Sequence, residues 1–245
     1  MKKTKRKMFL IALAIVLVIA VIALVNFSPI LFMKPVDTGE ILDTGVFAVK
    51  NNSNNIFIIE ANDGYIAIDA GSDAEKAEKD MAEISIDTAE IKYVFLTHSD
   101  YDHMATLEKF PNAQIYMSEN ELQMLNGDTK RNFFSRNSLP DGINLNRFIL
   151  LSDGQKLEVG GYMLECIETP GHTPGSMSFL LDERFLFTGD AIMVRNNIMS
   201  VHPFTMDKKL AENSIVRLED ALERSQYVFT AHYGYCETDR VEIYH

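Results

Sequence analysis

The stretch THSDYDHMA, Thr97–Ala105, decides how the rest of the sequence is interpreted. It places two of the chain's six histidines and two aspartates between positions 98 and 103. In an extended chain alternate side chains point to the same side, so His98, Asp100 and Asp102 can converge while His103 points toward a neighbouring position. Imidazole and carboxylate groups are ligands of zinc, iron and manganese. The stretch therefore predicts a metal site.

Three later loops, each after a strand-like segment, carry further candidate ligands. They are TPGHTPGS at 169–176, FTGDA at 187–191 and TAHYG at 230–234, and they supply His172, Asp190 and His232. Together with the first stretch they offer seven nitrogen and oxygen donors, which is enough for two divalent metal ions. Because no cysteine is among them, a structural zinc knot is not the expected kind of site.

The segments around the first motif predict a layered α/β fold. Three strands are expected in a meander, followed by a helix that Ser72 or Asp73 can cap and by a buried strand, at 45–51, 55–63, 64–71, 72–85 and 91–98. Strand, helix and strand in this order are typical of α/β units, in which ligand-bearing loops follow the strands. A second helix is expected over 207–225, where apolar residues recur at helical spacing.

The amino terminus has a different character from the rest of the chain. Five basic residues precede an unbroken apolar run over 8–25, which as a helix would rise about 27 Å, close to the roughly 30 Å of bilayer hydrocarbon. No small-residue cleavage pattern follows the run, so a retained anchor is favoured over a cleaved signal peptide. The basic residues predict a cytoplasmic amino terminus and an extracytoplasmic remainder, in a single-pass protein of the cell membrane. The expected domains are residues 1–33, a basic tail and transmembrane anchor, and residues 34–245.

The charge of the remainder limits the classes of partner. The net charge is −12, and setting aside the five basic residues of the tail leaves 18 basic against 35 acidic residues, or −17. Such a charge argues against nucleic acid as a partner. The expected partners are a small-molecule substrate and, through the amino-terminal helix, the membrane. An exported domain would allow a disulfide between Cys166 and Cys236, and two free thiols are the open alternative.

The combined motifs resemble those of the metallo-β-lactamase superfamily. The usual T-H-x-H-x-D-H run appears as THSDYDH, the later histidine lies in PGHTPGS, the bridging aspartate in FTGDA and the last histidine in AHYG. The order and spacing of the motifs agree with the family over about residues 42–238. The resemblance implies an αββα sandwich, here preceded by one transmembrane helix, with a metallo-β-lactamase-like domain over 34–245.

Carried over residue by residue, the resemblance implies a dinuclear site. One metal would be held by His98, Asp100 and His172, and the second by Asp102, His103 and His232, with Asp190 as the bridge. The ions would be zinc, with iron or manganese as alternatives. Asp69, in IAIDAGS, would orient a ligand from outside the site, and a turn carboxylate at the end of a strand is the open alternative. The implied reaction is hydrolysis of an ester, lactone, thioester, amide or phosphodiester bond by a bridging hydroxide, with Asp102 as the acid/base candidate.

Asp100 departs from the family pattern, which has histidine at this position. An additional oxygen donor shifts the preference toward iron or manganese. An acidic residue here also resembles flavodiiron proteins, so a di-iron oxidoreductase is one alternative function. A non-catalytic, membrane-tethered metal-binding module is the other.

Two further features lie outside the motifs. The polar segment 126–147 is expected to be a loop over one face. A solvated loop with ordinary charges is the favoured interpretation, and the alternative is that some of its side chains line an entrance for an anionic or aromatic group, namely Lys130, Arg131, Phe133, Phe134 and Arg136. His202, in VHPF, lies between Asp190 and His232 in sequence and is a candidate to reach the pocket.

Overall fold

The computed structural model describes residues 2–27, 31–131 and 137–243, and the chain divides into two compact units, Met1–Met33 and Lys34–His245. The first unit contains helix α1 (Lys2–Phe27). A membrane span needs about 20 predominantly apolar residues, and no helix among the described residues is both long and apolar enough to cross a membrane. The transmembrane anchor predicted over 8–25 is therefore not supported by the structure. The location of the chain in the cell stays a prediction from the sequence.

The second unit begins with the predicted meander and continues into parallel strands. The first sheet has the order β1-β2-β3-β4-β5-β6-β7, with bounds β1 (Gly39–Glu40), β2 (Val46–Asn51), β3 (Asn54–Ala61), β4 (Gly64–Ile68), β5 (Ile91–Phe95), β6 (Gln114–Ser118) and β7 (Phe148–Leu151). The pairs β2–β3 and β3–β4 are antiparallel, whereas β4–β5, β5–β6 and β6–β7 are parallel. The connections in this half include α2 (Ala74–Glu83), α3 (Tyr101–Met104) and α4 (Leu122–Asn126).

The carboxyl-terminal half forms the second large sheet. Its order is β15-β14-β11-β10-β9-β8, with bounds β8 (Lys156–Val159), β9 (Tyr162–Glu168), β10 (Met177–Leu181), β11 (Phe185–Gly189), β14 (Tyr227–Thr230) and β15 (Gly234–Glu237). A small sheet of β12 (Ile192–Arg195), β13 (Ile198–Val201) and β16 (Glu242–Ile243) and helix α5 (Lys208–Arg224) complete this half.

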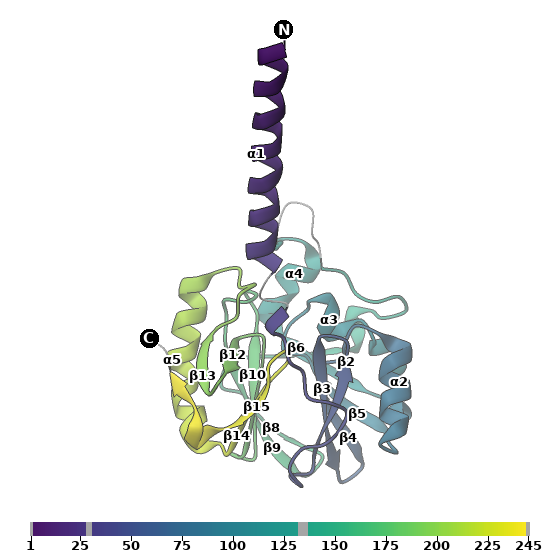
Figure 1. Cartoon of the computed structure of the whole chain (residues 1–245). Coiled ribbons are helices and arrows are strands. Elements are labelled where there is room, and N and C mark those ends of the chain that lie inside the picture. The colour runs from purple at the N-terminus through teal and green to yellow at the C-terminus, as the bar shows by residue number, and fades with distance from the viewer. Residues whose placement is uncertain (1, 28–30, 132–136, 244–245) are drawn as a thin grey trace. The chain divides into compact units, whose positions relative to one another are not determined.

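Apolar side chains pack in three layers that hold the two sheets and the helices together. In β3, Phe57 and Ile59 belong to the cluster that contains residues of both large sheets, whereas Ile56 and Ile58 belong to the cluster that includes Met81 of α2. This alternation follows from the two-residue period of a strand. On the far side of the second sheet a third cluster contains residues of α5. Figure 1 shows α2 and α5 on the outer faces of the two sheets, which confirms the predicted αββα sandwich.

Aromatic rings from the two large sheets pack against each other in the core. The ring of Phe57 in the first sheet lies 5.7 Å from that of Phe187 and 5.2 Å from that of Phe229, both in the second sheet. All three are buried. Replacing such a residue by alanine typically costs about 3–5 kcal/mol. The packing that fixes the distance between the sheets thus also fixes the distance between the loops that follow their strands.

The predicted helices begin at capped residues. Asp73 accepts a hydrogen bond from the backbone N–H of Lys76 at the start of α2, and Asp207 does the same for Leu210 at the start of α5. Such caps satisfy N–H groups that have no partner within the helix.

Both cysteines are buried free thiols. Burial raises the pKa of the Cys166 thiol to about 12.

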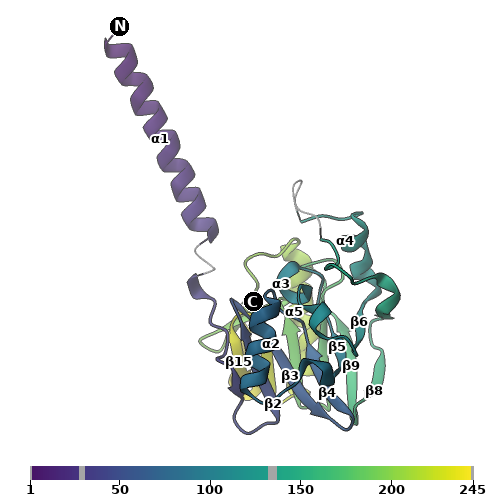
Figure 2. The ribbon, with the colours of Figure 1, turned by 90° about the vertical axis from the view of Figure 1, so that its right-hand side faces the viewer.

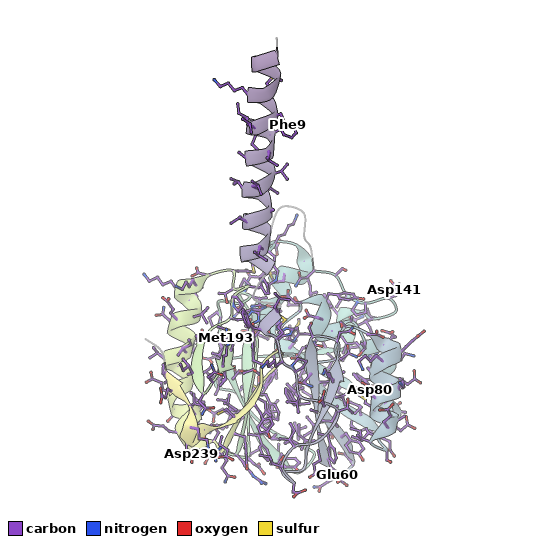
Figure 3. All side chains as sticks on the ribbon, viewed as in Figure 1. Phe9, Glu60, Asp80, Asp141, Met193 and Asp239 are labelled. Carbon is purple, nitrogen blue, oxygen red and sulfur yellow. The ribbon has the colours of Figure 1, made fainter. Side chains whose placement is uncertain are left out.

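Figure 3 shows the side chains of the second unit, with three exposed acidic residues among those labelled. Glu60, Asp141 and Asp239 lie at its periphery and are exposed to solvent. Helices α3 and α4 lie at one end of the sheets (Figure 2). The loops that carry the predicted ligands converge at the carboxyl ends of β5, β11 and β14, close to α3.

Candidate metal centre

Two pairs of parallel strands bring the predicted ligands together. The pair β4–β5 ends beside Asp69 and His98, and the pair β11–β14 ends beside Asp190 and His232. Because parallel strands end at the same edge of a sheet, the two pairs place these side chains on facing edges of the sandwich. His172 joins them from the loop between β9 and β10. The seven donors predicted from the sequence all fall within groups whose ligand atoms lie within 4.8 Å of one another.

One set of donors contains Asp102, His103, His232 and Asp190. The Nε2 atom of His232 lies 3.4 Å from Asp102 Oδ2 and 3.2 Å from Asp190 Oδ2. His103 Nε2 lies 3.6 Å from Asp190 Oδ2 and 3.9 Å from Asp102 Oδ2. We call these four residues the Asp190 set.

The second set contains His98, Asp100 and His172. Asp100 Oδ2 lies 3.3 Å from His98 Nε2 and 3.2 Å from His172 Nε2. His172 Nε2 is also 3.3 Å from Asp190 Oδ2, so Asp190 lies between the two sets, and its bridging role stays a prediction. We call these three residues the Asp100 set.

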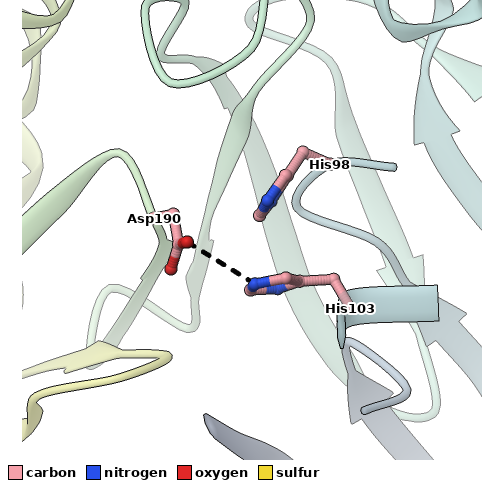
Figure 4. A group of neighbouring side chains, drawn as sticks. All are labelled: His98, His103 and Asp190. Carbon is pink, nitrogen blue, oxygen red and sulfur yellow. Dashed lines mark ion pairs between the residues drawn. The ribbon is translucent and has the colours of Figure 1, made fainter. Parts of the chain in front are cut away.

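Several donor atoms around Asp190 are buried without a hydrogen-bond partner among the described residues. They include His98 Nε2, His103 Nε2 and Asp190 Oδ1. Figure 4 shows the three side chains facing a common centre, with the ion pair between His103 and Asp190 dashed. A buried polar atom without a partner costs free energy unless an ion or water satisfies it. Buried imidazoles and carboxylates that converge in this way fit a divalent metal such as zinc.

Asp69 holds His103 from the side opposite Asp190. Its Oδ2 atom lies 2.8 Å from His103 Nδ1, and its Oδ1 accepts a hydrogen bond from the backbone N–H of Thr97 at 2.8 Å. The contact to Nδ1 directs His103 Nε2 toward Asp190. Asp69 is therefore the residue that orients a ligand, the role that the sequence comparison implies for it.

Glu121 fixes the loops that carry the Asp100 set. The side chain is fully buried, and its Oε1 accepts hydrogen bonds from the backbone N–H and the hydroxyl of Ser99 at 2.8 and 2.7 Å. Its Oε2 accepts hydrogen bonds from the Thr173 hydroxyl at 2.7 Å and from the Gly175 N–H at 3.1 Å. One carboxylate thus joins the loop of His98 and Asp100 to the loop of His172.

Two glycines allow the loops to approach this closely. A Cβ atom at Gly175 would lie 2.2 Å from the backbone nitrogen of Glu121. A Cβ atom at Gly189, which has φ of +52°, would lie 2.6 Å from Thr97 Cβ. Larger residues would therefore separate the loop of His172 from Glu121, and the loop of Asp190 from that of His98.

Arg131 enters the Asp100 set from the loop after α4. Its Nε donates a hydrogen bond to Asp100 Oδ1 at 2.9 Å, and its Nη2 donates to Asp100 Oδ2. The same Nη2 lies 2.5 Å from His172 Nε2, and Nη1 donates to the carbonyl of Phe204 at 2.7 Å. Asn137 Nδ2 adds a hydrogen bond to Asp100 Oδ1 at 3.0 Å. The sequence indicated Arg131 only as a residue lining an entrance, and the contact with Asp100 was not foreseen.

The other candidate side chains of this loop have different outcomes. Lys130 is exposed, and Phe133, Phe134 and Arg136 lie outside the described residues. A pocket of about 260 Å³ opens beside the Asp100 set, and its walls include Asp100, Asp102, Arg131 and Asn137. Asp102 is the most accessible carboxylate of the site, with 36% of its side chain exposed.

His202 reaches the site, as the sequence suggested it could. Its Nε2 lies 3.7 Å from Asp190 Oδ2, and its ring packs 4.9 Å from that of His172. The backbone N–H of Phe204 donates a hydrogen bond to His202 Nδ1 at 3.4 Å. Because Nδ1 accepts this bond, the proton of the neutral ring is on Nε2, facing Asp190. Burial lowers the pKa of His202 to about 4.

Burial and charge act in opposite directions on the other groups of the site. Burial lowers the pKa of His172 well below its ordinary value. Burial also opposes protonation of His103, but the carboxylates of Asp69, Asp190 and Asp102 outweigh it and raise the His103 pKa well above its ordinary value. Burial would raise the Asp100 pKa, yet His98, His172 and Arg131 hold it well below the ordinary value.

Comparisons with known proteins agree with this architecture. The chain is 34% identical over 145 residues to a probable polyketide biosynthesis zinc-dependent hydrolase of Bacillus subtilis, a match that covers 57% of this chain and 56% of that protein. It is 26% identical over 208 residues to an N-acyl homoserine lactonase of a Bacillus species, covering 82% and 79% of the two chains. The chain thus spans little more than half the length of the first of these relatives.

Solved structures show the same fold. A metallo-β-lactamase family protein of Thermus thermophilus superposes with a TM-score of 0.62 at 21% identity, over 82% of this chain and 77% of the other. The family model described as the metallo-β-lactamase superfamily matches residues 49–230, which include six of the seven predicted ligands, all except His232. The chain therefore belongs to the metallo-β-lactamase superfamily.

Proposed function

We propose that this protein is a metal-dependent hydrolase with zinc as the metal. The observation that carries the proposal is the convergence of Asp102, His103, Asp190 and His232, with His103 Nε2 and Asp190 Oδ1 buried and without hydrogen-bond partners among the described residues. A divalent ion bound there would lower the pKa of water toward neutrality and polarise a carbonyl or phosphoryl oxygen. The donor set of nitrogen and oxygen atoms suits zinc.

The surrounding residues support hydrolytic chemistry at this position. Asp69 and the Ser53 carbonyl orient the two imidazoles, because they contact Nδ1 of His103 and Nδ1 of His232 at 2.8 and 2.7 Å. Asp102 is partly exposed and faces the pocket, where a carboxylate is placed to accept a proton from an attacking water or to donate one to a leaving group. Arg131 places a fixed positive charge beside the same pocket.

The substrate class is proposed to be a small acyl ester, lactone or thioester. The support is the lactonase and the zinc-dependent hydrolase among the relatives. Amide and phosphodiester bonds are the remaining classes that the same chemistry serves. The pocket of about 260 Å³ between Asp102 and Arg131 suits a small polar group at the reacting end of such a substrate.

Hydrolysis of a substrate panel by the purified full-length chain tests the proposal. The panel holds an aryl ester, an acyl thioester, an N-acyl homoserine lactone, a β-lactam and an aryl phosphodiester, with zinc content measured on the same samples. We expect turnover of at least one acyl substrate that is lost after chelation and in His103→Ala, and kept in Asp141→Asn, a change at an exposed acidic residue. Zinc-loaded protein without turnover on the whole panel would contradict a hydrolase.

A further inference from the structure

The donors of the Asp100 set contact a positively charged side chain of the protein, that of Arg131. The guanidinium of Arg131 forms a fork with the carboxylate of Asp100, through Nε to Oδ1 and Nη2 to Oδ2, and Nη2 also meets His172 Nε2 at 2.5 Å. Only 19% of the Arg131 side chain is exposed, and 14% of Asp100. A guanidinium has only donors, so His172 Nε2 accepts here. Carboxylate and imidazole converge on this nitrogen as ligands converge on a metal.

A metal ion and this guanidinium cannot share the same donors. Zinc binds histidine nitrogen and carboxylate oxygen at about 2.0–2.2 Å. An ion bound to Asp100 Oδ2 and His172 Nε2 would therefore overlap the position of Arg131 Nη2, which lies within hydrogen-bond distance of both atoms. Arginine keeps its positive charge at any ordinary pH, so the two cations would also repel each other.

The hydrogen bonds distinguish the two donor sets. Both oxygens of Asp100 are satisfied by the protein, because Asn137 Nδ2 and Arg131 Nε meet Oδ1 while Arg131 Nη2 meets Oδ2. In the Asp190 set, His103 Nε2 and Asp190 Oδ1 have no hydrogen-bond partner in the described part of the chain. His98 Nε2 of the Asp100 set also has none there, and its ligand atom is grouped with those of His103 and Asp190. The Asp100 carboxylate and His172 Nε2 thus have the hydrogen-bond pattern of a completed ion pair, whereas the unpartnered Nε2 atoms of His98 and His103 lie around Asp190.

We infer that Arg131 takes the place of the metal ion in the Asp100 set, and that the chain binds a single metal ion, at the Asp190 set. The inference rests on the proposed function in assuming that a metal is bound. It explains the aspartate at position 100, because a bidentate fork needs a carboxylate and a histidine cannot form one. It also balances charge in each half: Arg131 with Asp100, and a divalent ion with Asp102 and Asp190. A di-iron centre, which needs two metal positions, is disfavoured by the same geometry.

Metal stoichiometry of the full-length chain tests the inference without reference to activity. Wild type, Arg131→Ala and Lys130→Ala are stripped with a chelator, loaded with excess Zn²⁺, freed of unbound ion and analysed by elemental mass spectrometry. Titration with Co²⁺, followed by its visible absorbance, provides an independent count. Lys130 is the matched control, since it is the exposed cation next to Arg131 in sequence. We expect one ion per chain for wild type and Lys130→Ala, and two for Arg131→Ala.

Each deviation from this result has a definite meaning. Two ions in wild type would overturn the inference while leaving a metallo-hydrolase intact. One ion in a folded Arg131→Ala, as judged by circular dichroism, would show that Arg131 does not exclude the second metal, and would also overturn it. No bound ion in wild type would overturn both the inference and the proposed function. Anomalous diffraction at the zinc edge on wild-type crystals needs no variant. One peak at the Asp190 set supports the inference, and a peak between Asp100 and His172 overturns it.

Discussion

Glu121 and Ser99 are joined by two hydrogen bonds to the same carboxylate oxygen, one from the Ser99 N–H at 2.8 Å and one from its hydroxyl at 2.7 Å. Ser99 lies between His98 and Asp100 in sequence, so this contact fixes the centre of the first motif. The other oxygen of Glu121 holds the loop of His172. A residue that contacts no candidate metal position thus determines how two ligand-bearing loops are spaced.

Glu121→Gln should destabilise the fold by about 1.5–3 kcal/mol, the usual contribution of a hydrogen bond to a charged group. Glutamine keeps one acceptor oxygen, but its amide NH₂ would face N–H and O–H donors. Urea unfolding followed by circular dichroism measures the change in free energy. The same glutamine substitution at Glu119 is the control, because Glu119 lies on the same short 3₁₀ helix and is exposed. Equal stabilities for the two variants would refute the role assigned to Glu121.

Asp69→Asn should lower zinc affinity by about 10- to 100-fold, the range seen when a group that orients a ligand is changed. The substitution removes the negative charge beside His103 Nδ1. The backbone should not be disturbed, because Asp69 has φ of +63° and asparagine tolerates that conformation as well as aspartate does.

Competition with a chromogenic chelator measures this affinity. Asp63→Asn is the control, since Asp63 is exposed and its carboxylate accepts a hydrogen bond from Tyr93, away from the site. An Asp69→Asn protein that binds zinc as tightly as the control would show that Asp69 does not tune the ligand.

The seven candidate ligands could be predicted because each belongs to a short motif at the end of a strand. Local sequence was also sufficient for helices α2 and α5: helix-forming residues and a cap at Ser72 or Asp73 indicated the first, and apolar spacing indicated the second. The structure uses Asp73 as the cap of α2, and the cap of α5 at Asp207 was not predicted. The role of Asp69 in orienting a ligand was implied by the resemblance to the family, with a turn carboxylate at the end of a strand as the alternative. These features depend on neighbours in sequence or on the order of strands.

Arg131 could not be assigned in the same way, because its contacts depend on tertiary structure. Its partners Asp100 and Phe204 are 31 and 73 residues away in sequence. Glu121 similarly reaches Thr173, 52 residues away. One signal was present: a carboxylate at position 100, where the family has histidine, requires a new partner. From the sequence, Asp100 was interpreted as a sign of a different metal ion, whereas in the structure its partner is Arg131.

The pH dependence of stability should contain a contribution from Glu165. Its carboxylate is paired with Arg224, at 3.0 Å, and with Lys156, at 3.2 Å. The Arg224 hydrogen bond lowers the pKa of Glu165, although burial opposes this. Since the folded-state pKa is below the unfolded one, the stabilisation is complete above the unfolded value, about 4.3, and is lost as the pH falls through the folded value.

Glu165→Gln should therefore cost up to about 1 kcal/mol at pH 7, the range for partly exposed ion pairs. The difference in unfolding free energy between wild type and variant should shrink as the pH falls below the unfolded value. Urea titrations at several pH values between neutrality and acid measure this difference directly. Glu158→Gln, at an exposed position of the neighbouring strand β8, should show no such pH dependence. A wild-type–variant difference that stays constant down to acid pH would exclude the ion pair as its source.

His202→Ala should lower hydrolytic turnover by about 100-fold, within the range for a lost hydrogen-bond donor to developing negative charge, while leaving the zinc content unchanged. The reason is the tautomer: Nδ1 accepts the Phe204 N–H, so Nε2 presents a proton toward Asp190 and the site rather than a lone pair. His202→Gln, which keeps a donor amide, should retain more turnover than His202→Ala. Turnover and zinc content together distinguish a hydrogen-bond donor from a metal ligand. A drop in zinc content in His202→Ala would make His202 a ligand of the metal, since its ligand atom also lies close to those of His172 and Asp190.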